Sequence, residues 1–308
     1  MKKIRKILIT GSSGMIGTRL FEKLLEEKYE VIGFDKKPNI WNSELNKLTI
    51  KGDLLRQKDI DKIRERFDLI VHLAANPYVY NSVINPDLAK ENVDMTYNIL
   101  EFARQKKIGK IIFSSSREVY GNLKGKTDFN EKNIDITRCE SPYAASKISA
   151  ETLIYAFSKC YKINYIIFRL SNVYGMYDNS ERFVPILLRD MNKNKEIYIY
   201  GKNKFLAFTY IDDCIGGIVK GIENFSKAKN NVFNLAGRNS SNLFKLAQTL
   251  KRNLQSKSKI IIKNIRTGEV ISFTADISKI KKILLWSPKY SIKLGVEKTI
   301  NWYKINLK

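Results

Sequence analysis

A glycine-rich turn after the first apolar segment places the strongest constraint on the fold. The segment "KILIT", residues 6–10, is followed by "GSSGMIG", with Gly11, Gly14 and Gly17 between an expected strand and an expected helix. Glycines at this spacing allow a tight turn, close approach of the backbone to a diphosphate, and close packing of helix on sheet. The N–H groups that begin the helix would bind the anion. The turn therefore predicts a dinucleotide site.

Short apolar segments alternate with helical patterns over the first part of the chain. The expected strands cover residues 6–10, 30–34, 69–74, 110–115 and 164–170. Helices are expected after Ile16, from about residue 88 to 107 and from 143 to 161, because apolar residues recur on one helical face. This alternation predicts an α/β protein with a doubly wound parallel sheet, the Rossmann fold.

The alternation weakens after residue 170, and the loops between apolar segments become longer. We expect residues 1–170 to form a dinucleotide-binding domain and residues 171–308 to form mainly a smaller, C-terminal substrate-binding lobe. Segments near 205–236, including the apolar "VFNLA" at 232–236, should return to the core of the first domain. The sequence contains no repeat or low-complexity linker that would separate the two parts.

An acidic residue at the end of the second expected strand indicates which dinucleotide binds. Asp35 lies 18 residues after Gly17, where a carboxylate can accept hydrogen bonds from an adenosine ribose. The same carboxylate would repel a 2′-phosphate, so we expect NAD in preference to NADP. Lys36 and Lys37 follow directly and could reverse this preference.

The composition argues against several other classes of protein. The formal charge is +24, but the lysines are spread along the chain without a nucleic-acid-binding motif, so we expect no nucleic-acid partner. No apolar stretch approaches the roughly 18 residues of a membrane span, and the run at 7–9 is too short for a signal peptide. We therefore expect a cytoplasmic protein without membrane contact. One histidine and three cysteines without metal-ligand spacing argue against a metal site.

Further motifs follow the glycine turn in an order that resembles one enzyme family. They are "GDL" (52–54), "HLAA" (72–75), "SSSREVYG" (114–121), "SPYAASK" (141–147), "RLSNVYG" (169–175), "FTYIDDC" (208–214) and "RTGEVISFTADISKIKKILLWSP" (266–288). Over about residues 5–303 the chain resembles extended short-chain dehydrogenases/reductases that act on nucleoside-diphosphate sugars. The resemblance implies NAD as cofactor, a nucleoside-diphosphate sugar as substrate, and a homodimer paired through the helices near 88–107 and 143–161.

A Tyr-x-x-x-Lys pattern provides the candidate catalytic base. Its occurrences include residues 120/124, 143/147 and 200/204, and glycines interrupt the first and third of these. Tyr143 and Lys147 follow Pro142 at the expected start of a helix, where four-residue spacing places them on one face. A nearby ammonium would lower the phenol pKa from about 10 toward the working pH. Tyr143 is therefore the expected general base for a sugar hydroxyl.

The resemblance assigns roles to further residues. Lys147 would also hold the nicotinamide ribose, and Ser116 would hydrogen-bond the same substrate hydroxyl as Tyr143. The expected cofactor contacts are Gly11, Ser13, Gly14, Met15, Ile16, Gly17, Asp35, Asp53, Leu54, Leu73, Ala74, Ala75, Asn92, Ser114, Tyr143 and Lys147. The only histidine, His72, is expected to be structural.

Substrate contacts are expected from Ser116 and Arg117 at the sugar and from Asn172 and Arg266 at the diphosphate. Arg266 could equally be a surface arginine. Many relatives carry Arg-Asp at the place where this chain has Leu206 and Ala207. A common phosphate-binding arginine is therefore missing, which leaves the identity of the substrate open.

Arg117 and Glu118 distinguish between related reactions. In 4-epimerases of the family the residue two after the catalytic serine or threonine is usually small or a hydroxyl, whereas 4,6-dehydratases and glucuronate decarboxylases typically have glutamate, as Glu118 is here. This carboxylate could remove the C5 proton. However, Arg117 occupies the place of the dehydratases' acidic aspartate and cannot donate a proton at neutral pH. It could neutralise Glu118, and we expect it to lower the proton affinity of that carboxylate and so its strength as a base.

We therefore expect a nucleotide-sugar 4-epimerase, UDP-glucose/UDP-galactose-like, that acts through a transient 4-keto sugar. A 4,6-dehydratase that uses Glu118 and a UDP-glucuronate decarboxylase are the enzymatic alternatives. The non-enzyme alternative is an NAD-sensing regulator on the same fold. The presence of Ser116, Tyr143 and Lys147 together argues against that alternative, because a sensor needs no proton-transfer group.

Overall fold

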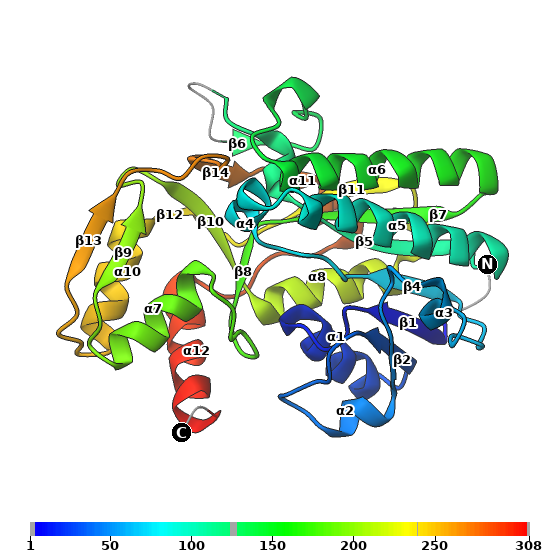
Figure 1. The fold of residues 1–308 in the computed structure, drawn as a ribbon, viewed down its shortest axis with the longest axis horizontal. Helices are drawn as coiled ribbons and strands as arrows, with labels where there is room; N and C mark the ends of the chain where they lie inside the picture. Colours follow the sequence, from blue (N-terminus) through cyan, green and yellow to red (C-terminus); the bar gives the residue numbers. More distant parts are fainter. Residues whose placement is uncertain (1–3, 124–127, 239, 307–308) are drawn as a thin grey trace.

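A computed structural model describes residues 4–123, 128–238 and 240–306, and a sheet of seven parallel strands runs through its centre (Figure 1). The strand order is β11-β7-β5-β4-β1-β2-β3. The strands are β1 (Lys6–Thr10), β2 (Glu30–Asp35), β3 (Thr49–Lys51), β4 (Leu69–His72), β5 (Lys110–Ser116), β7 (Asn164–Leu170) and β11 (Asn231–Leu235). The order reverses between β1 and β4, which is where ligands bind in sheets of this kind.

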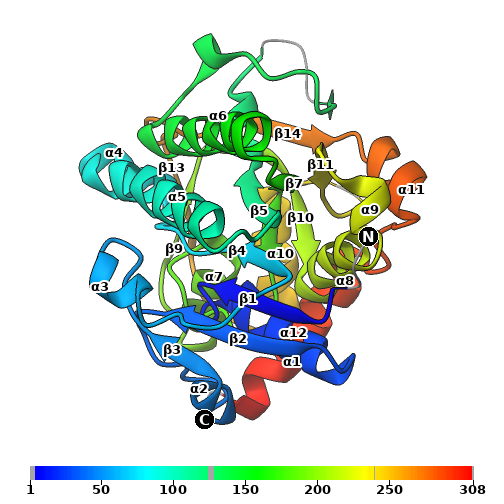
Figure 2. The same ribbon diagram turned by 90° about the vertical axis from the view of Figure 1, so that its right-hand side faces the viewer.

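Helices cover both faces of this sheet. Helices α5 (Asp87–Gln105) and α6 (Pro142–Tyr161) lie side by side over one face, while α1 (Met15–Glu26) and α8 (Ile211–Glu223) pack on the other (Figure 2). The shorter helices of this part are α2 (Glu44–Lys47), α3 (Gln57–Ile60), α4 (Val79–Ile84) and α9 (Phe225–Ala228), with 3₁₀ turns at Arg117–Tyr120 and Ile136–Arg138. The expected doubly wound α/β fold is confirmed.

Two apolar cores result, one on each face, because successive side chains of a strand point to opposite sides. In β1, Ile7 and Ile9 pack into the core beneath α1 and α8. Leu8 packs into the core beneath α5 and α6. Fully burying a side chain of this size stabilises a fold by about 1.5–3 kcal/mol. The continuous apolar character of these strands is therefore a consequence of burial on both faces.

Strand β4 is shorter than the sequence pattern predicts. The apolar run 69–74 continues beyond His72, but the strand ends there. The next residues pass over the glycine turn, where a Cβ on Gly11 would lie 2.7 Å from the backbone nitrogen of Ala74. Leu73 and Ala74 are apolar because they line this crossing and not because they extend the sheet.

The smaller lobe is built mainly from the second half of the chain. Its mixed sheet contains β12 (Ser240–Asn242), β10 (Phe205–Tyr210), β14 (Ser272–Ala275), β6 (Asp128–Phe129) and β8 (Asn172–Tyr174), and a separate pair joins β9 (Ile197–Tyr200) to β13 (Ile260–Lys263). Its helices are α7 (Phe183–Asn192), α10 (Leu243–Asn253), α11 (Ser278–Leu284) and α12 (Ile292–Asn306). Strand β6 comes from the first half of the chain but belongs to the sheet of the smaller lobe. Conversely, β11 from the second half is an edge strand of the central sheet, and α8 packs on that sheet. No helix in the described ranges combines the length and apolarity that crossing a bilayer requires.

Candidate active site

Two cavities meet at the carboxyl ends of the central strands. The glycine-turn cavity lies beside the turn between β1 and α1, and the lobe cavity lies between the end of β5, the start of α6 and the smaller lobe. The residues that line both are Ile16, Leu73, Ala75, Pro77, Ser114 and Arg182. A ligand in one cavity would therefore lie directly beside a ligand in the other.

The glycine turn has the geometry that a diphosphate requires. Gly11 has φ +73°, a left-handed conformation that L side chains rarely adopt. At Gly17, a Cβ would lie 2.1 Å from the carbonyl oxygen of Gly11, so α1 could not pack this closely on the turn. Both glycines thus expose the N-terminal N–H groups of α1 to the cavity.

The carboxylate of Asp35 lines the glycine-turn cavity and is hydrogen-bonded to the turn itself. Its oxygens accept hydrogen bonds from the backbone N–H groups of Ser13 and Lys37, each at 2.9 Å. Burial raises the pKa of Asp35, although these N–H groups and the charge of Lys36 act in the opposite direction. The side-chain oxygens of Ser12 and Ser13 are buried without a hydrogen-bond partner among the described residues. Neither serine lines the glycine-turn cavity or the lobe cavity, so the structure does not place the side chain of Ser13 at the expected cofactor contact.

Most of the expected cofactor residues gather in this cavity. Those that line it are Gly11, Gly14, Met15, Ile16, Gly17, Asp35, Asp53, Leu54, Leu73, Ala74, Ala75 and Ser114. Asn92 lines neither cavity: its side-chain oxygen accepts a 2.7 Å hydrogen bond from the N–H of Asn76, and its amide donates to Ser146. The structure therefore places Asn76 at the cavity wall, with Asn92 behind it.

Ser116, Tyr143 and Lys147 come together in the lobe cavity. Ser116 is the last residue of β5. Helix α6 begins after Ser141, because the Ser141 hydroxyl caps it by accepting a hydrogen bond from the N–H of Ala144 at 3.2 Å. The Lys147 ammonium donates to the carbonyl of Ser114 at 2.9 Å. A hydrogen bond also joins the side chains of Ser116 and Tyr143. The phenol, the hydroxyl and the ammonium thus face one space.

Burial controls the protonation of both titratable groups. It raises the pKa of Tyr143 to about 12, while the Ser116 hydrogen bond and the charges of Arg182 and Arg117 lower it by less. Burial also lowers the pKa of Lys147 to about 8. The expectation that Lys147 lowers the phenol pKa below its ordinary value is therefore not met, because desolvation outweighs the neighbouring charges.

Arg117 and Glu118 form a buried ion pair in the wall of the lobe cavity. Arg117 Nη2 lies 2.7 Å from Glu118 Oε1, and the Ser116 hydroxyl accepts from the N–H of Glu118. Arg117 lowers the pKa of Glu118 as expected, but burial is the larger effect and the pKa of Glu118 is raised. The expectation that Glu118 binds a proton less tightly than an ordinary glutamate is therefore wrong, because the effect of desolvation is larger than that of Arg117.

Arg266 and Asn172 both line the lobe cavity. The guanidinium of Arg266 lies between two rings, 3.6 Å from the centre of Tyr200 and 4.7 Å from that of Tyr80. A guanidinium stacked in this way keeps its N–H edge free for a phosphate. Asn172 donates to the carbonyl of Ala207 at 2.9 Å.

Leu206 lines the same cavity without offering any charge. The nearby Lys204 is buried and paired with Glu269. Glu269 belongs to the motif at 266–288 and Lys204 to the match at 200/204, but neither pattern assigned these residues a role in the site. Their place in the site follows from the fold alone.

The Tyr-x-x-x-Lys matches at 120/124 and 200/204 have different surroundings. Tyr120 is buried and donates to Asn234 at 2.6 Å, and Lys124 lies outside the described residues. Tyr200 and Lys204 reach the lobe cavity, but the first stacks on Arg266 and the second pairs with Glu269. Neither tyrosine lies beside Ser116 as Tyr143 does.

His72 is buried beneath the site and lines neither cavity. Its Nδ1 lies 2.7 Å from the Thr10 hydroxyl and its Nε2 lies 3.3 Å from that of Thr96. Because Thr96 donates to the carbonyl of Asn92, its oxygen accepts from Nε2–H, and Thr10 donates to Nδ1. Burial lowers the pKa of His72 to about 3, so the ring is neutral at physiological pH.

Comparison with known proteins places the chain in a family. Residues 7–236 match the sequence model of the NAD dependent epimerase/dehydratase family. A putative UDP-glucose 4-epimerase of Methanocaldococcus jannaschii is 32% identical over 97% of this chain and 99% of its own length. The chain belongs to this family and is an NAD-dependent enzyme.

Solved structures give the same picture. The UDP-glucose 4-epimerase of Thermotoga maritima, solved with UDP-glucose, superimposes with a TM-score of 0.90 at 29% identity, covering 98% of this chain and 100% of that one. The UDP-glucuronic acid 4-epimerase of Bacillus cereus, solved with UDP-glucuronic acid and NAD, gives 0.89 at 30% identity, covering 97% and 99%. The close agreement in fold extends over both the central sheet and the smaller lobe.

Proposed function

We propose that the chain is a nucleotide-sugar 4-epimerase, which inverts C4 of a UDP-glucose- or UDP-galactose-like substrate through a transient 4-keto sugar. The observation that carries this proposal is the convergence of Ser116, Tyr143 and Lys147 in the lobe cavity, close to Ser114, which lines both cavities. Relatives and solved neighbours named as 4-epimerases of UDP-glucose and UDP-glucuronic acid support the same assignment.

The residues of the glycine-turn cavity fit the cofactor. The N–H groups of the turn and of the first residues of α1 would hold the diphosphate, Asp35 the adenosine ribose, and Lys147 the nicotinamide ribose. NAD, when bound, accepts a hydride from C4 and returns it, so it is regenerated in each turnover.

Proton transfer is the task of the chain's own residues. Tyr143 would take the proton of the C4 hydroxyl, and Ser116 would hydrogen-bond the same oxygen. Since burial holds the pKa of Tyr143 near 12, its phenolate depends on positive charge in the site. On the return step Tyr143 would give the proton back, after the keto sugar has presented its other face.

The substrate diphosphate would lie toward Arg266 and Asn172. This places the sugar at the Tyr143 end of the lobe cavity and the nucleotide toward β9. Leu206 offers no phosphate contact, so Arg266 would carry more of the binding than in relatives with an arginine at that place.

A 4,6-dehydratase is the second candidate, and the raised pKa of Glu118 favours it. A buried carboxylate in the cavity wall is a stronger base than an exposed one and could take the proton from C5. Against it, loss of the C6 hydroxyl needs a proton donor, and the adjacent Arg117 provides charge without a transferable proton. Epimerisation requires neither Glu118 nor such a donor.

Mass spectrometry of the product separates these reactions. The enzyme would be incubated with UDP-, dTDP-, GDP- and CDP-hexoses and with UDP-glucuronate. The epimerase predicts an isomer of unchanged mass. A product lighter by one water would establish the dehydratase, a product lighter by carbon dioxide the decarboxylase, and no conversion of any substrate would favour the NAD-sensing regulator.

We also propose a cytoplasmic homodimer paired through α5 and α6. Their exposed surface includes Tyr97 and Tyr161, with the Arg104 guanidinium 5.4 Å from the centre of the Tyr161 ring. Light scattering after size-exclusion chromatography measures the mass directly. Substitution of both tyrosines by serine should then shift a dimer toward the monomer.

A further inference from the structure

One loop of the smaller lobe reaches across to the cofactor domain. Residues 175–182, the bridging loop, connect β8 to α7 and carry Arg182 at their end. Arg182 lines both the glycine-turn cavity and the lobe cavity. No sequence motif singles out this arginine, and its position depends on how the loop is held.

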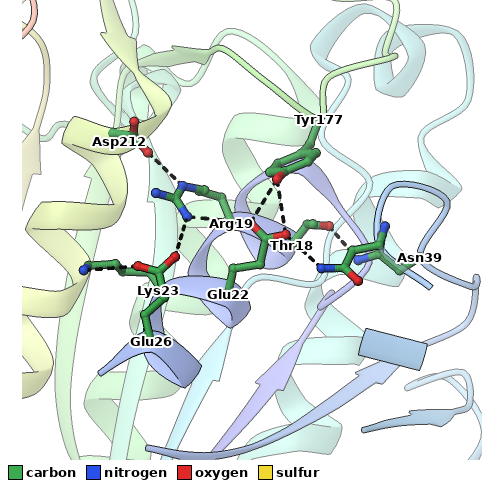
Figure 3. A network of polar contacts seen from close by, with 9 residues as sticks. Thr18, Arg19, Glu22, Lys23, Glu26, Asn39, Tyr177 and Asp212 are labelled. Atoms are coloured by element: carbon green, nitrogen blue, oxygen red, sulfur yellow. Dashed lines mark hydrogen bonds and ion pairs between the residues drawn. The ribbon is translucent and has the colours of Figure 1, made fainter. Parts of the chain in front are cut away.

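Tyr177 ties the bridging loop to α1. Figure 3 shows its hydroxyl directed at Glu22, with distances of 2.9 and 3.2 Å to the two carboxylate oxygens. Arg19, one turn earlier, lies 3.6 Å from Glu22 and donates to Asp212 of α8 at 2.8 Å. The bridging loop is therefore anchored to α1, the helix that begins at the glycine turn, and α1 is in turn bound to α8.

Aromatic contacts of the Tyr177 ring also hold the bridging loop in place. The Tyr177 ring lies 6.1 Å from Trp41, in the segment after β2, and 5.1 Å from Trp302 of α12, measured between ring centres. Trp41 and Trp302 also contact each other, at 5.2 Å. The contacts join three segments from both parts of the chain at the outer side of the cofactor domain.

The remaining loop residues fix the guanidinium of Arg182. Its Nη2 lies 3.0 Å from Asp178, and its Nε donates to the Ser180 hydroxyl at 3.1 Å. The backbone carbonyl of Asp178 in turn accepts a hydrogen bond from Tyr303 of α12. These bonds hold the side chain in one orientation.

In that orientation the guanidinium meets the start of α1. Nη2 lies 3.1 Å from the sulfur of Met15, the first residue of the helix. Nη1 has no hydrogen-bond partner among the described residues, and a third of the side chain (33%) is exposed. Within the described chain, Arg182 and Lys36 supply the positive charges of the glycine-turn cavity, and Lys36 follows the ribose-binding Asp35.

We propose that Arg182 binds the diphosphate of the dinucleotide and that Tyr177 is the positioning residue that keeps it there. A planar guanidinium with a free N–H group is well suited to phosphate oxygens, and the N-terminus of α1 already favours an anion at this place. The substrate lobe thereby contributes a cation to the cofactor site of the other domain.

The functional role of this contact, retention of the dinucleotide during epimerisation, rests on the proposed function. The hydride removed from C4 must return to the same sugar, so the reduced dinucleotide must stay bound between the two transfers. Loss of NADH at that stage would leave a 4-keto sugar and an enzyme that needs new NAD. Arg182 would slow this loss.

Titration of NAD and NADH without any sugar nucleotide tests the proposal independently of the reaction. We expect Arg182→Met to weaken binding of both by roughly 10- to 100-fold, the effect of losing a charge-assisted hydrogen bond. Arg182→Lys should retain part of the affinity, and Tyr177→Phe should weaken it by a smaller factor. Arg252→Met, at an exposed arginine of α10 that lines neither cavity, is the matched control and should bind as the wild type.

A parallel titration with UDP distinguishes the two diphosphates that could reach Arg182. Unchanged UDP affinity in Arg182→Met, with weakened NADH, supports the proposal. Unchanged NADH affinity with weakened UDP would overturn it and assign Arg182 to the substrate. If Arg182→Met fails to fold, as judged by its thermal transition, the NADH affinities of Arg182→Lys and Tyr177→Phe test the proposal instead. Unchanged NADH affinity in both variants would equally overturn the proposal.

Discussion

Lys147 and Tyr143 lie on one face of the first turns of α6, with the ammonium nitrogen 5.9 Å from the centre of the phenol ring. The ammonium hydrogen-bonds the carbonyl of Ser114, so β5 holds it in place. This separation leaves the phenol bonded to Ser116 and the ammonium beside the shared edge of the two cavities. The two groups can thus serve different ligands, the phenol the sugar and the ammonium the cofactor.

Replacing Tyr143 with Phe should remove most turnover while leaving NAD binding intact. The change deletes one hydroxyl, and general acid–base groups contribute about 10²- to 10⁴-fold to rates. Steady-state assays with the true substrate measure the loss. Tyr29→Phe, at a tyrosine between α1 and β2 that lines neither cavity, is the control. A wild-type rate in Tyr143→Phe would mean that another group is the base.

The affinity of the free enzyme for NAD should fall as the pH rises through about 8. The pKa of Lys147 is lowered to about 8 by burial, so the ammonium is present below that pH and is lost above it. An anionic dinucleotide is held less well by the neutral amine. Titrations of NAD across this range measure the effect, and Lys147→Met should bind weakly without the pH dependence. A Kd independent of pH in the wild type would show that the ammonium charge does not contribute.

Asp35 should make the enzyme prefer NAD to NADP. Its carboxylate lines the glycine-turn cavity and is fixed by two backbone N–H groups, so a 2′-phosphate on a ribose bound there would meet a like charge. Competitive titration of the two cofactors measures the preference, and Asp35→Ser should reduce it by roughly tenfold or more. Tighter binding of NADP to the wild type would show that Lys36 and Lys37 dominate.

The protein should lose stability in mild acid because of His72. Its pKa is about 3 when folded and 6.5 when unfolded, so below 6.5 the unfolded chain takes up a proton that the folded chain cannot. The free energy of unfolding then falls by about 1.4 kcal/mol per pH unit, or about 2 kcal/mol between pH 6.5 and pH 5. Urea denaturation at the two pH values measures the fall. His72→Gln should reduce the fall by the same amount, and an equal fall in both proteins would contradict the assignment.

Replacing Glu118 with Gln should leave epimerisation within roughly tenfold of the wild-type rate, since no proton passes through this residue in that reaction. Arg117 would lose its ionic partner but would keep a hydrogen-bonding neighbour of the same shape. The rate of C4 inversion and the mass of the product are the two readouts. An accumulating 4-keto sugar that does not proceed further would point to the dehydratase instead.

Local patterns in the sequence were sufficient for much of the central sheet. The five predicted strands all form, and α1, α5 and α6 begin within a few residues of their expected positions, because apolar periodicity reflects burial on defined faces. The glycine turn could likewise be read directly, since only glycine accepts the conformation and the close contacts at Gly11 and Gly17.

The tertiary structure determined the pKa values of the buried site residues and the position of Arg182, because both depend on residues far away in the sequence. The sequence places Tyr143 beside Lys147 and Glu118 beside Arg117, and these neighbours alone predict lowered pKa values. The fold buries both groups, and desolvation by the whole surrounding core reverses the direction. Arg182 likewise reaches the glycine turn only because Tyr177 binds a helix 155 residues earlier in the chain. Sequence spacing determines which residues share an element, whereas burial and long-range contacts determine the charge and the position with which they meet a ligand.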